Sequence, residues 1–375
     1  MCCAISRQHE VTLIKHSRRQ PGRMAVMALL ASLFTGLAGP VLAATLVVSD
    51  PDNRRVVFID TLSGAQQRLA TGGAGPRAVA LSPDGKTGLV ADYGAVRIAG
   101  KSVQVLDVTR GALRKTISIA PYQRPSAIQF LPDGRRALIA VQGDKSLLMI
   151  DVGAGRIEAS FGAPADSVRQ FALSEDGKNV YLGDPAGGKI SKIDLTSGRE
   201  TAVSTTEASA QKMAVSTNGG RLWVVDRNED LVKVMDGRDL HLIAGLDTGN
   251  LPMGLTLTPN GRYALVSNAL SADVVVYDTT SLEQSQIIST RSVPSTSPMP
   301  RSESENLSDV KRMSQISIPV AISAAPDGIS AFVMNNFSGE IIQFDIFTGA
   351  PLHIFQGIPR PGGMAYSPVT MGGAR

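Results

Sequence analysis

The sequence has 375 residues, a formal net charge of +4 and a pI near 9.1. Residues 1–43 contain five basic residues and one acidic residue, so they carry this charge and the remainder is neutral overall. A neutral remainder does not favour a nucleic acid or another polyanion as partner. Both cysteines, Cys2 and Cys3, lie in the same N-terminal part, which leaves no thiol for a disulfide, a metal–sulfur cluster or a haem attachment after residue 43.

Residues 1–43 are typical of a secretory signal peptide. A basic region that ends at Arg23 is followed by the apolar run MAVMALLASLFTGLAGPVLA and then by small residues, which predicts cleavage after Ala43. An uncleaved membrane anchor is the less favoured alternative. Arg18 and Arg19 leave a twin-arginine export route open beside the Sec route. We expect the processed protein to be periplasmic or secreted and to have no contact with the membrane.

The rest of the chain consists of one repeated unit: an apolar strand, a tight turn, a second strand, a polar loop and a third strand that ends in aspartate. Most of the tight turns contain Asp-Gly or Asn-Gly, because hairpin turns need positive φ at these positions. These pairs are Asp84-Gly85, Asp133-Gly134, Asp176-Gly177, Asn260-Gly261 and Asp327-Gly328.

The aspartates that end the third strands give the period of the repeat. They are Asp60, Asp107, Asp151, Asp194, Asp236, Asp278 and Asp345. Their separations are 47, 44, 43, 42, 42 and 67 residues. A period of this length with four short strands is typical of a β-propeller blade, and the seven copies predict seven blades.

The two ends of the repeat region complement each other. The N-terminal end, TLVVSD, RRVVFID and AQQRLA, lacks the first strand of a unit, whereas the C-terminal RPGGMAYSP is a first strand with nothing after it. We therefore expect a single domain over residues 44–375. Its fold class is all-β, a seven-bladed β-propeller of four-stranded antiparallel blades whose ring is closed by a C-terminal strand that completes the N-terminal blade.

The longest separation exceeds the preceding one by 25 residues, and the surplus falls in residues 289–314. This segment is rich in serine and proline and has almost nothing to bury, which predicts a disordered insertion between blades 6 and 7. A loop that docks a partner is the alternative.

Two units carry a resemblance to a known family. LPMGLTLTPNGRYALVSN with DVVVYDTTS, and GPRAVALSPDGKTGLVAD with SVQVLDVTRG, resemble the YVTN-repeat β-propellers, and the resemblance spans nearly all of Thr45–Pro368. It implies the propeller fold. It implies no single activity, since similar repeats occur in amine-dehydrogenase-like subunits, lactonases and surface proteins.

No motif predicts catalysis. The two histidines after residue 43, His241 and His353, are expected on or beside the outermost strands of blades 5 and 7, away from the axis. This placement disfavours a histidine-ligated metal, a haem or a Ser–His–Asp triad. We therefore expect no catalytic residue, no metal and no cofactor.

A polar residue ends the second strand of every blade: Asp50, Asp92, Gln142, Asp184, Asp226, Asn268 and Asn335. Such residues commonly cap the following loop by accepting hydrogen bonds from its backbone, and this is the favoured interpretation. The alternative is a polar or cation-binding ring around the axis.

Basic residues stand at the start of three innermost strands: Arg77, Arg169 and Lys212. They either pair with the neighbouring aspartates or hold a carboxylate or phosphate group of a ligand. Loops on this face vary between blades, while turns on the opposite face are nearly uniform, so we expect any ligand on this face. The candidate ligand-binding residues are Arg77, Asp92, Tyr93, Arg169, Asp184, Lys212, Asp226, Asn268 and Asn335.

These patterns predict a non-catalytic binding module or scaffold in the periplasm, whose partner is an unknown small polar ligand or a periplasmic protein. Two alternatives remain open. One is a lactonase-type hydrolase that uses funnel carboxylates and arginines, and the other is an accessory subunit of a periplasmic quinoprotein dehydrogenase system.

The signal peptide makes a first prediction. Protein recovered from the periplasm should begin within about two residues of Ala44, because the small-residue cleavage site directly follows the apolar run. N-terminal sequencing measures this, and a chain that begins at Met1 or Met24 would contradict it.

Overall fold

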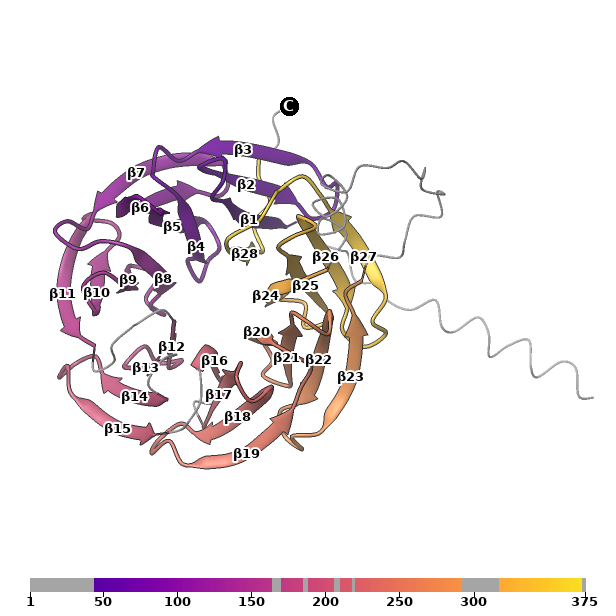
Figure 1. Ribbon diagram of the computed structural model, residues 1–375. Helices are drawn as coiled ribbons and strands as arrows, with labels where there is room; N and C mark the ends of the chain where they lie inside the picture. Colours follow the sequence, from indigo (N-terminus) through magenta and orange to yellow (C-terminus); the bar gives the residue numbers. More distant parts are fainter. Residues whose placement is uncertain are drawn as a thin grey trace, which may run out of the picture. The chain divides into compact units, whose positions relative to one another are not determined.

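The computed structural model describes residues 44–163, 170–184, 188–205, 210–217, 220–291 and 317–372, all within the compact unit Leu42–Arg375. The strands in these residues form seven four-stranded antiparallel sheets, arranged around an axis as the blades of a propeller (Figure 1). The predicted fold class is thus confirmed. None of the described residues belongs to a helix that is long and apolar enough to cross a membrane.

The strands of each blade follow one another from the axis outwards. Blade 1 consists of β28 (Met364–Ser367), β1 (Thr45–Asp50), β2 (Arg55–Asp60) and β3 (Gln66–Ala70). Blade 2 consists of β4 (Pro76–Leu81), β5 (Thr87–Ala95), β6 (Ile98–Asp107) and β7 (Ala112–Ser118). Blade 3 consists of β8 (Pro125–Phe130), β9 (Arg136–Val141), β10 (Ser146–Asp151) and β11 (Arg156–Gly162). Blade 4 consists of β12 (Phe171–Leu173), β13 (Asn179–Gly183), β14 (Lys189–Asp194) and β15 (Glu200–Thr205).

The last three blades keep the same order. Blade 5 consists of β16 (Ala210–Val215), β17 (Arg221–Asp226), β18 (Leu231–Asp236) and β19 (Leu242–Asp247). Blade 6 consists of β20 (Pro252–Leu257), β21 (Tyr263–Asn268), β22 (Asp273–Asp278) and β23 (Gln284–Ser289). Blade 7 consists of β24 (Pro319–Ala324), β25 (Ser330–Asn335), β26 (Glu340–Asp345) and β27 (Pro351–Phe355).

The Asp-Gly turns connect the first and second strands of the blades. Gly85, between β4 and β5, has a φ of 71°, a left-handed backbone that glycine adopts without steric cost. The carboxylate of Asp84 accepts hydrogen bonds from Ser82 Oγ at 2.5 Å and from the Lys86 backbone N–H at 3.0 Å. The bond from Ser82 is the main reason that the pKa of Asp84 lies below its usual value. The Asp84 carboxylate is thus satisfied by donors from its own turn.

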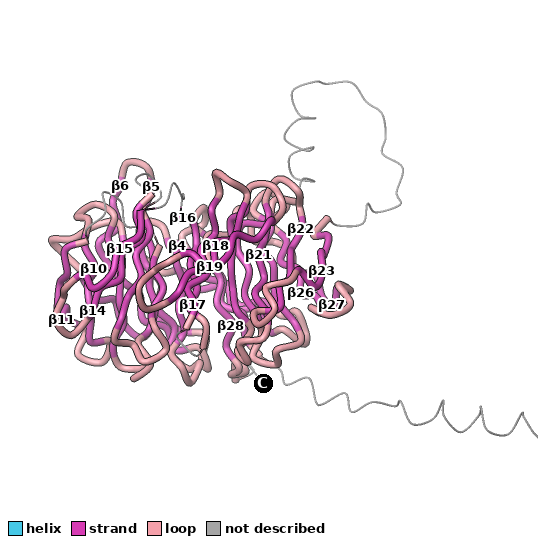
Figure 2. The backbone as a smooth tube through the Cα atoms, turned by 90° about the horizontal axis from the view of Figure 1, so that it is seen from below, coloured by secondary structure: helices cyan, strands magenta, loops and turns pink. Residues whose placement is uncertain are grey.

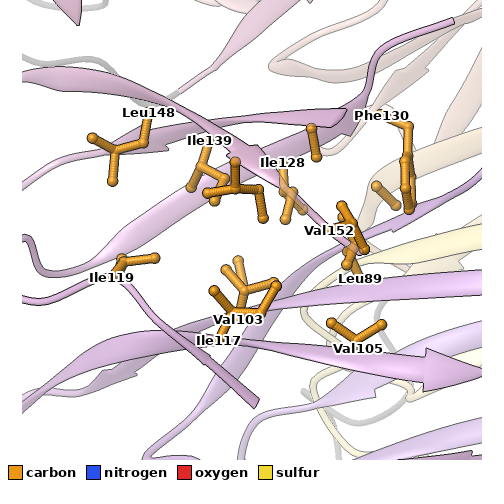
Figure 3. Packing of buried hydrophobic residues seen from close by; sticks show 14 of the residues in the cluster. Leu89, Val103, Val105, Ile117, Ile119, Ile128, Phe130, Ile139, Leu148 and Val152 are labelled. Atoms are coloured by element: carbon orange, nitrogen blue, oxygen red, sulfur yellow. The ribbon is translucent and has the colours of Figure 1, made fainter. Parts of the chain in front are cut away.

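The hydrophobic core lies between neighbouring blades. Figure 3 shows one such layer, in which Leu89 and Val103 of blade 2 face Ile139 and Leu148 of blade 3, and all four are fully buried. Each of the other six interfaces between adjacent blades has its own cluster of this kind. Because each sheet buries its two faces against its neighbours, the core does not extend to the axis of the ring.

The chain closes the ring as predicted, with β28 from the C-terminal end pairing with β1. Thr45 lies opposite Ser367 in this pair, and Ser367 Oγ donates a hydrogen bond to the Gly85 carbonyl of blade 2 at 2.8 Å. On the other side, the ring of Tyr366 packs against Phe332 of blade 7 with 5.3 Å between centroids. Burial raises the pKa of Tyr366 to about 12. The closing strand thus connects blade 1 to both of its neighbours.

Two segments depart from the regular blade. Strands β5 and β6 have nine and ten residues, and their hairpin extends beyond the neighbouring loops on one face of the ring (Figure 2). The insertion was predicted to start at residue 289, but Ser289 is the last residue of β23. Residues 292–316 of this region, like the predicted signal peptide 1–43, lie outside the described residues.

The closing strand makes a second prediction. Replacing Tyr366 by alanine should lower the free energy of unfolding by about 2 kcal/mol, because it removes an aromatic ring from the contact between blades 7 and 1. Tyr366→Phe keeps the ring and should cost less than about 0.5 kcal/mol. Urea denaturation followed by circular dichroism measures both, and equal losses in the two variants would contradict the assigned role of the ring contact.

Candidate functional site

Two cavities lie along the axis. The larger, of about 940 Å³, is lined by the first residues of the innermost strands and by the β5–β6 hairpin. The smaller, of about 580 Å³, is lined by the opposite ends of the innermost strands. Six residues line both cavities, and we call them the waist: Val79, Ala127, Ile128, Gln170, Lys212 and Leu255. The two cavities thus share a largely apolar part of their lining.

The larger cavity is rich in positive charge. Among the described residues that line it, the basic side chains are Arg77, Arg124, Lys212 and Arg360, and Asp52 is the one carboxylate. Asp52 already accepts from Arg360, with 2.9 Å between carboxylate oxygen and Nε. No ion pair to a described carboxylate involves Arg77, Arg124 or Lys212. A chain that is neutral from residue 44 onward therefore concentrates positive charge at one point, which attracts anions.

Tyr93 holds two of these arginines at the mouth of the cavity. The Arg77 and Arg124 guanidinium carbons lie 4.6 and 5.3 Å from the centre of its ring. The Tyr93 hydroxyl donates a hydrogen bond to the Gln142 side-chain oxygen at 2.7 Å. Arg124 also donates to the carbonyls of Ala95 and Val96 at 3.5 and 3.3 Å, so it connects blade 3 to the β5–β6 hairpin. Cation–π contacts orient the guanidinium groups and leave their remaining N–H groups to bind a ligand.

The position of Arg124 follows a rule of the repeat. It directly precedes the proline that begins the innermost strand of its blade, and it has a φ of 58°. Arg360 and Leu251 precede prolines at the corresponding places and have φ values of 46° and 57°. A left-handed backbone is uncommon for residues other than glycine. Its recurrence in three blades shows that the fold imposes it, while the side chain at the position is free to vary.

The polar residues at the ends of the second strands do not line the larger cavity. Asp50, Asp92, Asp226, Asn268 and Asn335 are at most 4% exposed, and none of them lines the larger cavity. Asp184 is also buried and does not line it.

Their partners come from the third strand of the same blade or from an adjoining loop. Asp92 accepts from the Gly75 backbone N–H at 2.8 Å and from Ser102 Oγ at 3.1 Å. Asp50 accepts from Arg55 Nε at 2.7 Å. Asn268 donates to the Asp273 carboxylate at 2.8 Å. These are the contacts of loop caps, because each one satisfies a buried polar group within a short stretch of chain.

Asp226 also takes part in an ion pair. Its carboxylate lies 2.8 Å from Lys233 Nζ, and the same ammonium lies 2.8 Å from Glu229. Burial by itself lowers the pKa of Lys233, but the hydrogen bonds to the two carboxylates outweigh it and raise the pKa above its usual value. Lys233 is therefore held in its charged form inside blade 5.

Of the candidates predicted from sequence, Arg77, Tyr93 and Lys212 thus line the larger cavity, and Arg169 lies outside the described residues. Sequence reasoning missed Arg124, Gln170 and Arg360. The dipeptides Arg124-Pro125 and Arg360-Pro361 did contain a signal, since the first stands where the innermost strand β8 begins and the second lies just before the innermost strand β28.

The histidines lie on the outer side of the ring. His353 is in β27, and His241 directly precedes β19. Among the described residues, Asp236, Asp239 and His241 bring their ligand atoms within 4.8 Å of one another. His241 Nδ1 lies 2.7 Å from the Asp239 carboxylate, and both side chains are more than half exposed. This is the geometry of a solvated turn and does not by itself define a metal site.

Comparison with known proteins places the chain among its relatives. No protein-family profile matches it. The β subunit of hydrazine synthase from Kuenenia stuttgartiensis is 25% identical over 232 residues, which is 56% of this chain and 55% of that protein. The alignment therefore spans only about half of this relative.

Two solved structures share the fold. A chain of Kuenenia stuttgartiensis hydrazine synthase superposes with a TM-score of 0.62 and 21% identity, over 80% of this chain and 92% of that one. A candidate 6-phosphogluconolactonase from Bacteroides uniformis superposes with a TM-score of 0.65 and 14% identity, over 87% and 99%. The fold and the larger cavity thus define a seven-bladed β-propeller with an open, basic cavity on its axis. Within that class, the chain is related to the hydrazine synthase β subunit and is similar in fold to the Bacteroides uniformis protein.

The ion pair in blade 5 makes a third prediction. Asp226→Ala leaves Lys233 buried with one exposed partner and should lower the free energy of unfolding by about 3 kcal/mol at neutral pH. Glu229→Ala is the matched control, because Glu229 contacts the same ammonium from a more exposed position, and it should cost less than about 1 kcal/mol.

The pH dependence gives a second check on this pair. A raised pKa in the folded protein contributes stability that is present at neutral pH and is lost as the pH rises through that pKa. The deficit of Asp226→Ala should therefore shrink in strongly alkaline solution. Denaturant titrations over pH 7 to about 11 measure it, and a deficit that does not depend on pH would contradict the assignment.

Proposed function

We propose that this protein is a non-catalytic periplasmic binding module that holds a small anionic ligand in the larger cavity. The observation that carries the proposal is the pair Arg77 and Arg124, which flank Tyr93 at the cavity mouth and have no described carboxylate as partner. The periplasmic location rests on the signal-peptide pattern of residues 1–43.

The two guanidinium groups suit an anion that presents pairs of oxygen atoms. An arginine presents paired N–H donors that match a carboxylate or a phosphate, and two arginines on one aromatic ring can bind separate groups of a single ligand. The cavity of about 940 Å³ admits a molecule of metabolite size. Charge and volume together favour a small di- or tri-anion over a polymer.

Binding is better supported than hydrolysis. Among the described residues that line the larger cavity, none is histidine, and the one carboxylate, Asp52, is paired with Arg360. A lactonase-type mechanism needs a group that activates water beside the carbonyl. The fold of the candidate 6-phosphogluconolactonase supports this alternative through its architecture alone.

A protein partner is a second candidate, supported by the relationship to a protein that is a subunit of hydrazine synthase. Exposed apolar side chains also occur on loops and hairpins: Val96, which lines the larger cavity, is 92% exposed, Ile98 of the same hairpin 54% and Leu270 of the β21–β22 loop 67%. Exposed apolar residues on variable loops are typical of docking surfaces. Size-exclusion chromatography tests this candidate, because Val96→Asp with Leu270→Asp should release a partner that co-elutes with the unmodified protein.

The main proposal is tested by isothermal titration of residues 44–375 with phosphate, citrate and uncharged glucose. Citrate or phosphate should bind and glucose should not. The double variant Arg77→Ala/Arg124→Ala should lose about 2 kcal/mol of binding free energy, which is roughly 30-fold in affinity. Higher salt should weaken binding in the unmodified protein, because the contact is electrostatic and partly exposed.

Arg262→Ala provides the matched control. Arg262 also stacks on a tyrosine, with its guanidinium carbon 5.1 Å from the centre of the Tyr263 ring, but it follows the Asn260-Gly261 turn outside both cavities. Its replacement should leave affinity unchanged. Equal losses of affinity in both variants, or full affinity in a folded double variant, would rule out Arg77 and Arg124 as the anion site.

A further inference from the structure

Lys212 has an unusual position for a lysine. It lies on β16, the innermost strand of blade 5, and it belongs to the waist where the two cavities meet. Four of the other five waist residues are apolar, and Gln170 is the remaining polar one. The side chain is partly buried, and both cavities give access to it.

The surroundings of Lys212 do not stabilise its positive charge. Within the described part of the chain, its Nζ donates a hydrogen bond to the Gln170 side-chain oxygen at 3.3 Å. The other described ionisable groups that line the cavities are Arg77, Arg124, Arg360 and Asp52 in the larger one and Glu175 in the smaller one. None of them forms an ion pair with Lys212. Burial in the apolar waist lowers the pKa of Lys212.

Lys233 of the same blade shows the opposite situation. It lies between the carboxylates of Asp226 and Glu229, which raise its pKa. Paired in this way, its amine is protonated and has no lone pair to share. Lys212 has an amide oxygen as its partner instead, so more of its population is the neutral amine, which is the nucleophilic form.

We propose that Lys212 is a nucleophilic amine that condenses with a small carbonyl compound in the larger cavity to form an imine. The expected class is an aldehyde or ketone that also bears a carboxylate. This class follows from the cavity lining, because Arg77 and Arg124 line the same cavity as Lys212 and can bind the carboxylate of a compound that enters it. The choice of an anionic carbonyl rests on the proposed function, whereas the reactivity of the amine does not.

The reaction needs no oxidant and no further reactant. The Nζ lone pair forms a bond to the carbonyl carbon, and the electron pair of the C=O π bond moves to oxygen, which takes up a proton. The nitrogen loses one proton to give the carbinolamine. Its hydroxyl then takes up a second proton and leaves as water, while the nitrogen lone pair forms the C=N bond and the remaining N–H proton is released. Amine and carbonyl thus give imine and water, and the apolar waist limits the water that would reverse the reaction.

Reductive trapping tests this inference on residues 44–375. The protein is incubated at pH 7 with glyoxylate or with propanal in the presence of sodium cyanoborohydride, and the alkylated lysines are identified by peptide mass spectrometry. Lys212 should be alkylated at least about tenfold faster than exposed Lys101 and paired, buried Lys233. The midpoint of its rate–pH profile should lie below that of Lys101, because only the neutral amine reacts.

Lys212→Arg removes the amine and keeps a positive charge, and it should abolish the fast phase of alkylation. If this variant folds poorly, the relative alkylation rates of Lys212, Lys101 and Lys233 in the wild-type protein still test the proposal. Alkylation of Lys212 that is no faster than that of Lys101 with both carbonyl compounds would overturn the imine proposal.

The two carbonyl compounds separate this inference from the anion site. Arg77→Ala should slow trapping of glyoxylate at Lys212 by roughly tenfold and leave trapping of uncharged propanal unchanged. If propanal labels Lys212 selectively but Arg77→Ala does not affect glyoxylate, the amine is reactive and the anion-binding function fails. If the titrations detect anion binding but Lys212 is not labelled selectively, the anion site stands and the imine does not.

Discussion

Face-to-face packing of neighbouring sheets is the constraint on which the rest of this structure depends. Each four-stranded blade has two apolar faces, and it can bury both only when a blade stands on either side, as Leu89 and Ile139 show at one interface. The arrangement has no stable end until the ring is closed, which is the role of β28 beside β1. Because the core lies between blades, the axis is left without packing partners and two cavities lie along it.

Because of this packing, the polar residues near the larger cavity fall into two groups. Residues at the ends of second strands lie within the blade, where a carboxylate is tolerated only if nearby donors satisfy it. Asp92 and Asp226 have such donors in the loops that follow or precede them. Residues at the start of innermost strands face the unfilled axis instead. Arg77 and Arg124 can therefore remain without a described carboxylate as partner, since the open cavity leaves them accessible to solvent.

Blade 5 shows how far two chemically identical side chains can differ within one sheet. Lys233 on β18 has two carboxylates within 2.8 Å, and its positive charge is stabilised. Lys212 on β16 faces the apolar waist, and its charge is disfavoured. The difference follows from the place of each strand in the blade, because only the innermost strand is exposed to the axis. A binding or reactive group in this fold is thus most readily built at the start of an innermost strand.

The amino-acid sequence by itself determined the architecture of the ring. The period of the strand-ending aspartates, the Asp-Gly turns such as Asp84-Gly85 and the complementary ends of the chain are local patterns, and each predicted an element that the structure contains. Local patterns also indicated Arg77 and Lys212, which stand at the same position of their repeats, and Tyr93, which lies in a segment that varies between blades.

Only the tertiary structure decided which polar residues share a cavity. Asp92, Asp226 and Asn268 stand at the same position of their repeats, as a ring around the axis would require, yet they lie inside the blades. Hydrogen bonds with Gly75, Lys233 and Asp273 hold them there. Arg124 and Gln170 come from blades 3 and 4 and meet the funnel through side-chain direction, which the period of a repeat does not encode. The protonation state of Lys212 likewise depends on the waist residues, which come from four other blades. The burial and the protonation of a side chain at the axis depend on residues from several blades. The sequence of a single repeat therefore does not determine them.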